Sequence, residues 1–163
     1  VNIVQAQSRV WFIVLMPIGA IVFFITLLAE LERIPFDLPH AESEIVMGYQ
    51  TEYSSMAFGS IQLGTYIRFY ALSGIFTTLF LGGWYGPQFL PAGFEIINQV
   101  EWFTLKTLLV MVFIIILRGV NPRFRLDLLL KFGWSRLLVL AFLNLFIAIF
   151  ILQMGWFPFT GGI

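Results

Sequence analysis

The chain has 163 residues, of which 60% are hydrophobic, 18% aromatic and 11% charged, and its formal net charge is zero. Because a soluble domain carries about 25% charged residues, this composition indicates an integral membrane protein, and the zero net charge excludes the basic surface of a nucleic-acid-binding protein. The chain has no Cys and one His, so disulfides, cysteine-bound clusters and a metal site are not expected, and any redox cofactor should lie in another subunit.

Four hydrophobic segments are predicted to span the membrane. The first, residues 10–29, has no charged side chain and is long enough to cross a core of ~30 Å. Pro17 and Gly19 inside it predict a kink. The other spans are residues 58–82, 102–117 and 137–154. The sequence therefore predicts an all-α integral membrane protein with a single transmembrane domain over residues 1–163.

Residues 30–57 are predicted to form an acidic loop, because Pro35 and Pro39 prevent a helix there. This loop holds six of the nine acidic residues: Glu30, Glu32, Asp37, Glu42, Glu44 and Glu52. One interpretation is a solvated loop whose carboxylates keep it out of lipid. The other is a partly dry, acidic pocket, because large apolar side chains such as Phe36 and Tyr53 lie among the acids. Burial of that kind raises carboxyl pKa values and lets carboxylates relay protons.

Two cations are predicted inside hydrophobic segments. Arg68 lies within residues 58–82, where an Arg is costly and is expected to face a partner in the acidic loop or in a neighbouring subunit. Structural and functional interpretations of Arg68 both stay open. Lys106, near the start of residues 102–117, is expected to extend its ammonium group back to the membrane surface.

Residues 118–136 are predicted to form a basic loop. It holds five of the nine Lys and Arg residues: Arg118, Arg123, Arg125, Lys131 and Arg136. Residues 83–101 hold none, so the positive-inside rule places the loops 30–57 and 118–136 in the cytoplasm. The basic loop, which also holds Asp127, is expected to anchor that membrane face or to balance the acidic loop or an acidic partner subunit.

The order of residues in the acidic loop is specific. The pieces that carry a resemblance are Ala29-Glu30, Arg33, Pro35-Phe36-Asp37-Leu38-Pro39, Ala41-Glu42-Ser43-Glu44 and Thr51-Glu52-Tyr53-Ser54. They resemble the signature AE-x-x-R-x-PFDLPE-AESELV-x-G-x-x-TEYS of a family of respiratory complex I membrane proteins, the H-subunit (or subunit 1) family. Further pieces agree in order: Ile3-Val4-x-Ala6-Gln7, Leu81-Gly82-Gly83-Trp84 and Trp102-Phe103-x-x-Lys106.

The resemblance implies the second half of an eight-helix fold, with the first four helices on a separate chain or missing because this chain is a piece. It implies a subunit without a redox centre in a proton-translocating NAD(P)H- or ferredoxin-quinone oxidoreductase. The residues implied for the quinone chamber or proton path are Glu30, Arg33, Phe36, Asp37, Glu42, Glu44, Glu52 and Tyr53. Their expected charge partners are Arg68, Arg118, Arg123, Arg125 and Asp127.

The resemblance also implies the surroundings of the chain. No cofactor is expected to be bound by this chain; quinone is the implied substrate, and iron–sulfur clusters are implied for partner subunits. The implied partners are the other membrane subunits, the hydrophilic-arm subunits and the lipid bilayer, and no nucleic acid. The implied location is an energy-transducing membrane, the prokaryotic plasma membrane.

Two departures from the signature leave an alternative open. His40 stands where the signature has Glu, and Thr65 stands where the family commonly has the Glu of an AEY sequence. These departures are compatible with a divergent branch, a membrane-bound ferredoxin-dependent hydrogenase or sulfur reductase that does not use quinone. A third interpretation is a structural anchor with no proton path.

Overall fold

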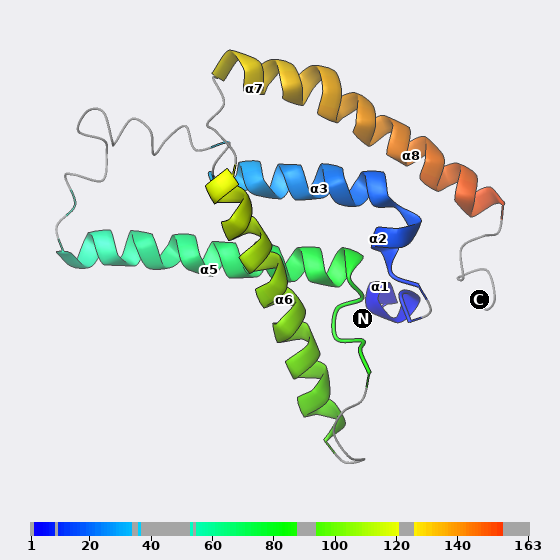
Figure 1. The fold of residues 1–163 in the computed structure, drawn as a ribbon, viewed down its shortest axis with the longest axis horizontal. Helices are drawn as coiled ribbons and strands as arrows, with labels where there is room; N and C mark the ends of the chain where they lie inside the picture. The colour runs from blue at the N-terminus through cyan, green and yellow to red at the C-terminus, as the bar shows by residue number, and fades with distance from the viewer. Residues whose placement is uncertain are drawn as a thin grey trace.

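The computed structural model describes residues 2–8, 10–33, 36, 53, 55–87, 94–120 and 126–154. Within these residues all regular structure is helical (Figure 1). The elements in chain order are α1 (Asn2–Ala6), α2 (Phe12–Leu15), α3 (Pro17–Glu30), α5 (Ser55–Phe80), α6 (Glu95–Val120), α7 (Leu126–Phe132), the π-helical turn η2 (Gly133–Leu137) and α8 (Leu138–Gln153).

The first predicted span is broken in two. Met16 lies between α2 and α3 with φ −131° and ψ 63°, outside the helical region, and Pro17 opens α3. Proline has no N–H to donate to the preceding turn, so the helix breaks there and restarts. The kink expected at Pro17 is therefore confirmed, and the helix is interrupted there rather than only bent.

Several other boundaries differ from the sequence-based expectation, and two of the differences are large. Helix α6 begins at Glu95 rather than at residue 102, because Glu95 and Glu101 are exposed and a helix tolerates exposed acids in its first turns. Residues 126–136, predicted as part of the basic loop, are helical, and that prediction is wrong. The Leu-rich run that follows Asp127 continues through η2 into α8, and the Lys and Arg side chains are exposed on this helix.

The four-span expectation is met in part. Helix α6 and the continuous segment Asp127–Gln153 are long and apolar enough to cross a membrane, and Pro17–Glu30 is apolar but shorter. Helix α5 has 26 residues, yet its Gly, Ser, Thr, Tyr and Arg content makes it less apolar. The described residues therefore contain two helices that meet the criteria for a membrane span.

Helices α5 and α6 pack closely through small polar residues. Ser73 and Thr77 of α5 and Thr107 of α6 are fully buried, and each hydroxyl donates to a carbonyl oxygen of its own helix. Gly74 faces the Phe103 ring, where an added Cβ would lie 3.3 Å from Cζ. Small residues of this kind let two helix backbones approach each other in a membrane.

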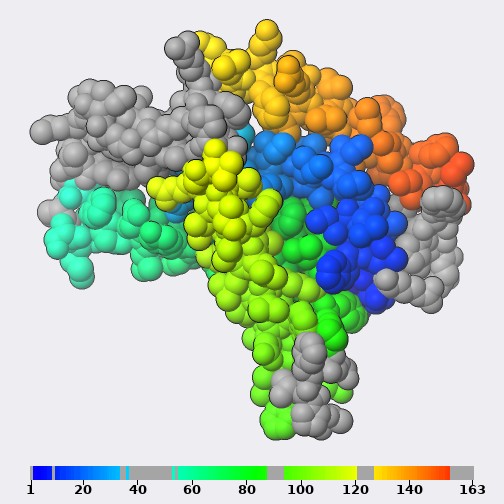
Figure 2. Space-filling model, in the orientation of Figure 1, coloured from blue at the N-terminus to red at the C-terminus, as the bar shows by residue number. Residues whose placement is uncertain are grey.

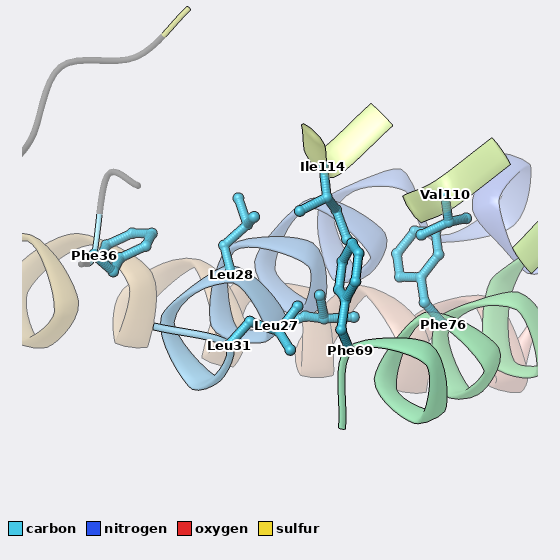
Figure 3. Close-up of a cluster of buried hydrophobic side chains, with 8 residues drawn as sticks. All are labelled: Leu27, Leu28, Leu31, Phe36, Phe69, Phe76, Val110 and Ile114. Carbon is cyan, nitrogen blue, oxygen red and sulfur yellow. The ribbon is translucent and has the colours of Figure 1, made fainter. Parts of the chain in front are cut away.

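The apolar core lies where α3, α5 and α6 meet (Figure 3). Its buried members are Leu27, Leu28, Leu31, Phe36, Phe69, Phe76, Val110 and Ile114. Phe24 of α3 bridges the other two helices, with ring centroids 5.6 Å from Phe76 and 5.4 Å from Phe113. The segment α7–α8 lies outside this core, along α3 at one edge of the molecule (Figures 1 and 2).

The N-terminal segment is attached to the end of α5 through Gln7. The Gln7 Nε2 group donates to the carbonyl oxygens of Thr78 and Leu79 at 3.0 Å, and its Oε1 accepts from Gly82 N at 2.9 Å. Gly82 and Gly83 have φ of 73° and 53°, a region that favours glycine. A Cβ on Gly83 would lie 2.9 Å from Val4 Cγ2, so the turn after α5 also requires glycine for space.

We predict that Gly83→Ala lowers the free energy of unfolding by about 1–3 kcal/mol, because it adds left-handed strain and a clash with Val4. Thermal unfolding of the detergent-solubilised chain, followed by size-exclusion chromatography, measures the effect. The control is Gly59→Ala, since nothing lies within 4 Å of a Cβ added there. Equal melting temperatures for the two variants would contradict the prediction.

Candidate functional site

The end of α3 carries a charged cluster that faces the middle of α5. Glu30 is the last residue of α3, and its Oε1 lies 3.6 Å from Nη2 of Arg68. The side chains of Arg68 and Glu30 keep 44% and 66% of their surface exposed, respectively. The partner expected for Arg68 is thus the first acid of the acidic stretch. An exposed pair of this kind contributes little stability, roughly 0–1 kcal/mol, so its position matters more than its strength.

Arg33 adds a second guanidinium group beside this pair. Its Cζ lies 5.9 Å from the Tyr66 ring centroid and 5.7 Å from that of Phe69, within cation–π range. The turn that places Arg33 passes through Glu32, whose φ of 49° is left-handed. Two backbone bonds then hold Arg33: its N–H donates to Leu28 O, and its carbonyl accepts from Phe36 N at 2.7 Å.

Phe36 fixes this turn by burial rather than by charge. Its ring is buried in the core together with Leu31, next to α3 and α7 (Figure 3). Because Phe36 N also donates to Arg33 O, burial of this one ring holds the Arg33 backbone in place. Phe36 therefore contributes to the candidate site as an anchor for a charged residue.

The charged side chains of this cluster can bind and orient charge. Within the described residues, Arg68 pairs with Glu30, and the Arg33 guanidinium lies over the Tyr66 and Phe69 rings and forms no ion pair. The described residues contain no group of three or more potential metal ligands. They also contain no Cys thiol that could act as a nucleophile.

The remaining predicted site residues are not brought together in the described part of the chain. Tyr53 is half-exposed, and Arg118 and Asp127 are exposed at the end of α6 and the start of α7. No ion pair joins Arg118 or Asp127 to another described residue. The other predicted residues lie outside the described residues: Asp37, Glu42, Glu44, Glu52, Arg123 and Arg125.

Lys106 occupies a different environment from the one that the sequence predicts. Its side chain is only 6% exposed, so the expectation that it reaches the membrane surface is wrong. The ammonium group donates to the carbonyl oxygens of Leu81, Gly83 and Tyr85 at 2.8, 3.2 and 2.5 Å. It also lies 4.8 Å from the ring centroid of Trp11. Helix α6 begins at Glu95, so Lys106 lies three turns inside the helix and cannot reach its end.

A signal for this arrangement was present in the sequence. The Gly82-Gly83 pair follows a hydrophobic span, and a glycine turn exposes consecutive carbonyl oxygens that need a donor where water is excluded. A lysine in the next span is the matching donor. The charge of Lys106 alone suggested that its ammonium group lies at the membrane surface. The backbone oxygens that it contacts decide its position instead.

An apolar cavity of about 720 Å³ opens beside the core. Helices α2, α3 and α6 line it. Phe76 of α5 and Leu81, the residue that follows α5, complete the lining. Pro17 and Phe24 line it along α3, and Leu117 lines it near the end of α6. Its apolar lining suits a hydrocarbon chain rather than a polar ligand.

The chain is similar to known proteins over most of its length. A family model described as NADH dehydrogenase matches residues 1–149. The chain is 44% identical over 153 residues to the H 1 subunit of NADH-quinone oxidoreductase from Geobacter metallireducens, covering 94% of this chain and 44% of that protein. It is 46% identical over 153 residues to the H subunit of the same enzyme from Anoxybacillus flavithermus, covering 94% and 45%. The chain spans less than half the length of these curated relatives.

We predict that Lys106→Met lowers the free energy of unfolding by about 1–3 kcal/mol, because three carbonyl oxygens, buried or partly buried, lose their donor. The measurement is the thermal unfolding of the detergent-solubilised chain. The matched control is Leu105→Met, which places the same side chain at the neighbouring exposed position. A melting temperature for Lys106→Met equal to that of the control would show that the ammonium group is dispensable.

A double-mutant cycle tests the Glu30–Arg68 pair. Glu30→Gln, Arg68→Gln and the double variant should give a favourable coupling energy of about 0.2–1 kcal/mol, reduced by salt. The control cycle pairs Arg68→Gln with Glu95→Gln, at the end of α6 that lies away from α3 (Figure 1). Coupling in the control cycle as large as in the Glu30 cycle would rule out a specific pair.

Proposed function

The chain belongs to the NADH dehydrogenase family, and from that premise we propose that it is a membrane subunit of a proton-translocating, complex I-type oxidoreductase. It holds no redox centre and transfers no electrons itself. It forms part of the quinone-reduction chamber and the start of the proton path. The single observation that carries this proposal is the charged cluster of Glu30, Arg33 and Arg68 at the point where the acidic stretch begins.

The proposed role of this cluster is to couple charge to proton movement. Reduction of a quinone headgroup creates negative charge, and a fixed pair of guanidinium groups responds to a nearby anion. Arg68 then shares its charge between Glu30 and that anion, and the carboxylates that follow in the sequence change their protonation or position. The proposed path continues through Asp37, Glu42, Glu44 and Glu52.

The apolar cavity supports the quinone part of the proposal. A quinone carries a long hydrocarbon tail, and the cavity of about 720 Å³ offers an apolar wall along α2, α3 and α6. Helix α3 joins this cavity to the charged cluster, because Pro17 and Phe24 line the cavity and Glu30 ends the helix. A tail bound there would approach the cluster along α3.

The proposed surroundings follow from the family. Iron–sulfur clusters belong to hydrophilic-arm subunits, and further membrane subunits flank this chain. The first four helices of the eight-helix fold would lie on a separate chain or on a missing part of this one. The proposed location is the prokaryotic plasma membrane, with residues 30–57 on its cytoplasmic side. The charged segment from Arg118 to Arg136 would face the same side.

One observation keeps the hydrogenase or sulfur-reductase alternative in view. Thr65 stands where the family signature has a carboxylate, and its hydroxyl donates to Gln62 O at 2.7 Å, within its own helix. A proton path through this point of α5 would need another group. The names of the curated relatives favour the quinone branch. An iron–nickel Cys motif in the adjoining soluble subunit would identify the alternative.

We predict that replacing Glu42 and Glu44 with Gln lowers the number of protons pumped per electron in the assembled complex, because neutral amides cannot carry protons along the path. Quinone reduction and proton pumping are measured together in reconstituted vesicles. The control is Glu101→Gln, an exposed acid of α6 outside the cluster. Unchanged pumping and turnover would sink the proposal, and loss of assembly alone would favour a structural anchor.

A further inference from the structure

The π-helical turn η2 brings two cations to one side of the α7–α8 segment. Lys131 and Arg136 are five residues apart, and in an α-helix such residues point about 140° away from each other. The π-helical turn Gly133–Leu137 begins between them, and because its hydrogen bonds join residues five apart, the chain rotates less per residue there than in an α-helix. Both side chains line the same hollow, of about 270 Å³, together with Leu128, Phe132 and Ser135.

The charges in this hollow are available for a ligand. Both cations are exposed, and within the described part of the chain neither forms an ion pair. Asp127 is the only acid in the sequence between residues 126 and 153, so this segment has more positive than negative charge. The Ser135 hydroxyl donates to Lys131 O of its own helix, which leaves the two cations as the donors that face the hollow.

An apolar groove adjoins the cationic hollow. It has a volume of about 440 Å³ and runs between α3 and the segment α7–η2–α8. Ile25 and Ala29 line it from α3, and Leu137 and Ala141 line it from the opposite side. Phe132 lines both the hollow and the groove, so the two spaces lie on either side of one residue.

We propose that this pair of spaces binds one anionic phospholipid, with its phosphate between Lys131 and Arg136 and one acyl chain in the groove. A phospholipid joins a phosphate directly to hydrocarbon, and the hollow and groove place cations directly beside an apolar channel. Basic pockets beside membrane helices bind anionic headgroups. The proposal does not depend on the quinone chamber or on the proton path.

Two features favour a lipid over an acidic protein segment. The helix that carries the site is long and apolar enough to cross a membrane. Trp134, 73% exposed, lies within the same turn, and Trp is typical of the depth of lipid headgroups. An acidic peptide would use the two cations but would leave the apolar groove empty.

The test uses the full chain, purified from nanodiscs that contain either phosphatidylcholine alone or phosphatidylcholine with phosphatidylglycerol. Native mass spectrometry counts the lipids that stay bound to the chain. We expect one retained phosphatidylglycerol and no comparable retention of phosphatidylcholine. Each cation near an anionic lipid is worth roughly fivefold in binding, so Lys131→Gln with Arg136→Gln should lower retention roughly 25-fold.

Two controls separate a built site from general surface charge. Lys131→Arg with Arg136→Lys keeps both charges and should keep the lipid. Ala141→Phe fills the groove without changing charge and should also lower phosphatidylglycerol retention. Equal retention by the wild-type chain and the Gln variant would overturn the proposal. It would also be overturned if Ala141→Phe retained as much lipid as the wild type, because the cations would then act without the groove.

Discussion

The buried ammonium group of Lys106 is the interaction on which the arrangement of the helices depends. Backbone carbonyls that turn away from a helix need another hydrogen-bond donor where the packing excludes water. The turn after α5 presents three such carbonyls, and Lys106 of α6 donates to all of them. The same turn receives Gln7 from the N-terminal segment. Three parts of the chain that are distant in sequence are thus held at one point by polar contacts to backbone.

From this point the rest of the molecule can be followed along its helices. Helix α6 leaves the Lys106 contact and packs on α5 through Ser73, Thr77 and Thr107, so the two helices cross closely. Their crossing forms one side of the core, and α3 closes it with Leu27 and Leu28. Helix α3 ends at Glu30, shortly after these core residues. The packing of apolar side chains therefore sets the position of the charged cluster.

The sequence predicted the positions of the helices better than the contacts between them. Hydrophobic runs located the helices, and Pro17 located the break, because these features act locally. Hydropathy could not place the start of α6 or the helix over residues 126–136, because exposed charged residues are compatible with helix as well as loop. The environment of Lys106 was not predicted because its partners are backbone oxygens, which every residue type has. The sequence could predict that Arg68 has an acidic partner, since a cation in an apolar helix needs one, but it could not identify Glu30 as that partner.

The way Gln7 is bound has a consequence for how the sequence can vary. Within the segment around the end of α5, its amide contacts main-chain atoms, namely the carbonyls of Thr78 and Leu79 and the N–H of Gly82. Side chains at positions 78 and 79 can therefore be exchanged without loss of these bonds. A single inserted or deleted residue between them and Gly82 would misalign the carbonyls against the N–H. At positions 78 and 79 the fold therefore requires a fixed chain length, whereas at Gly82 and Gly83 it also requires glycine.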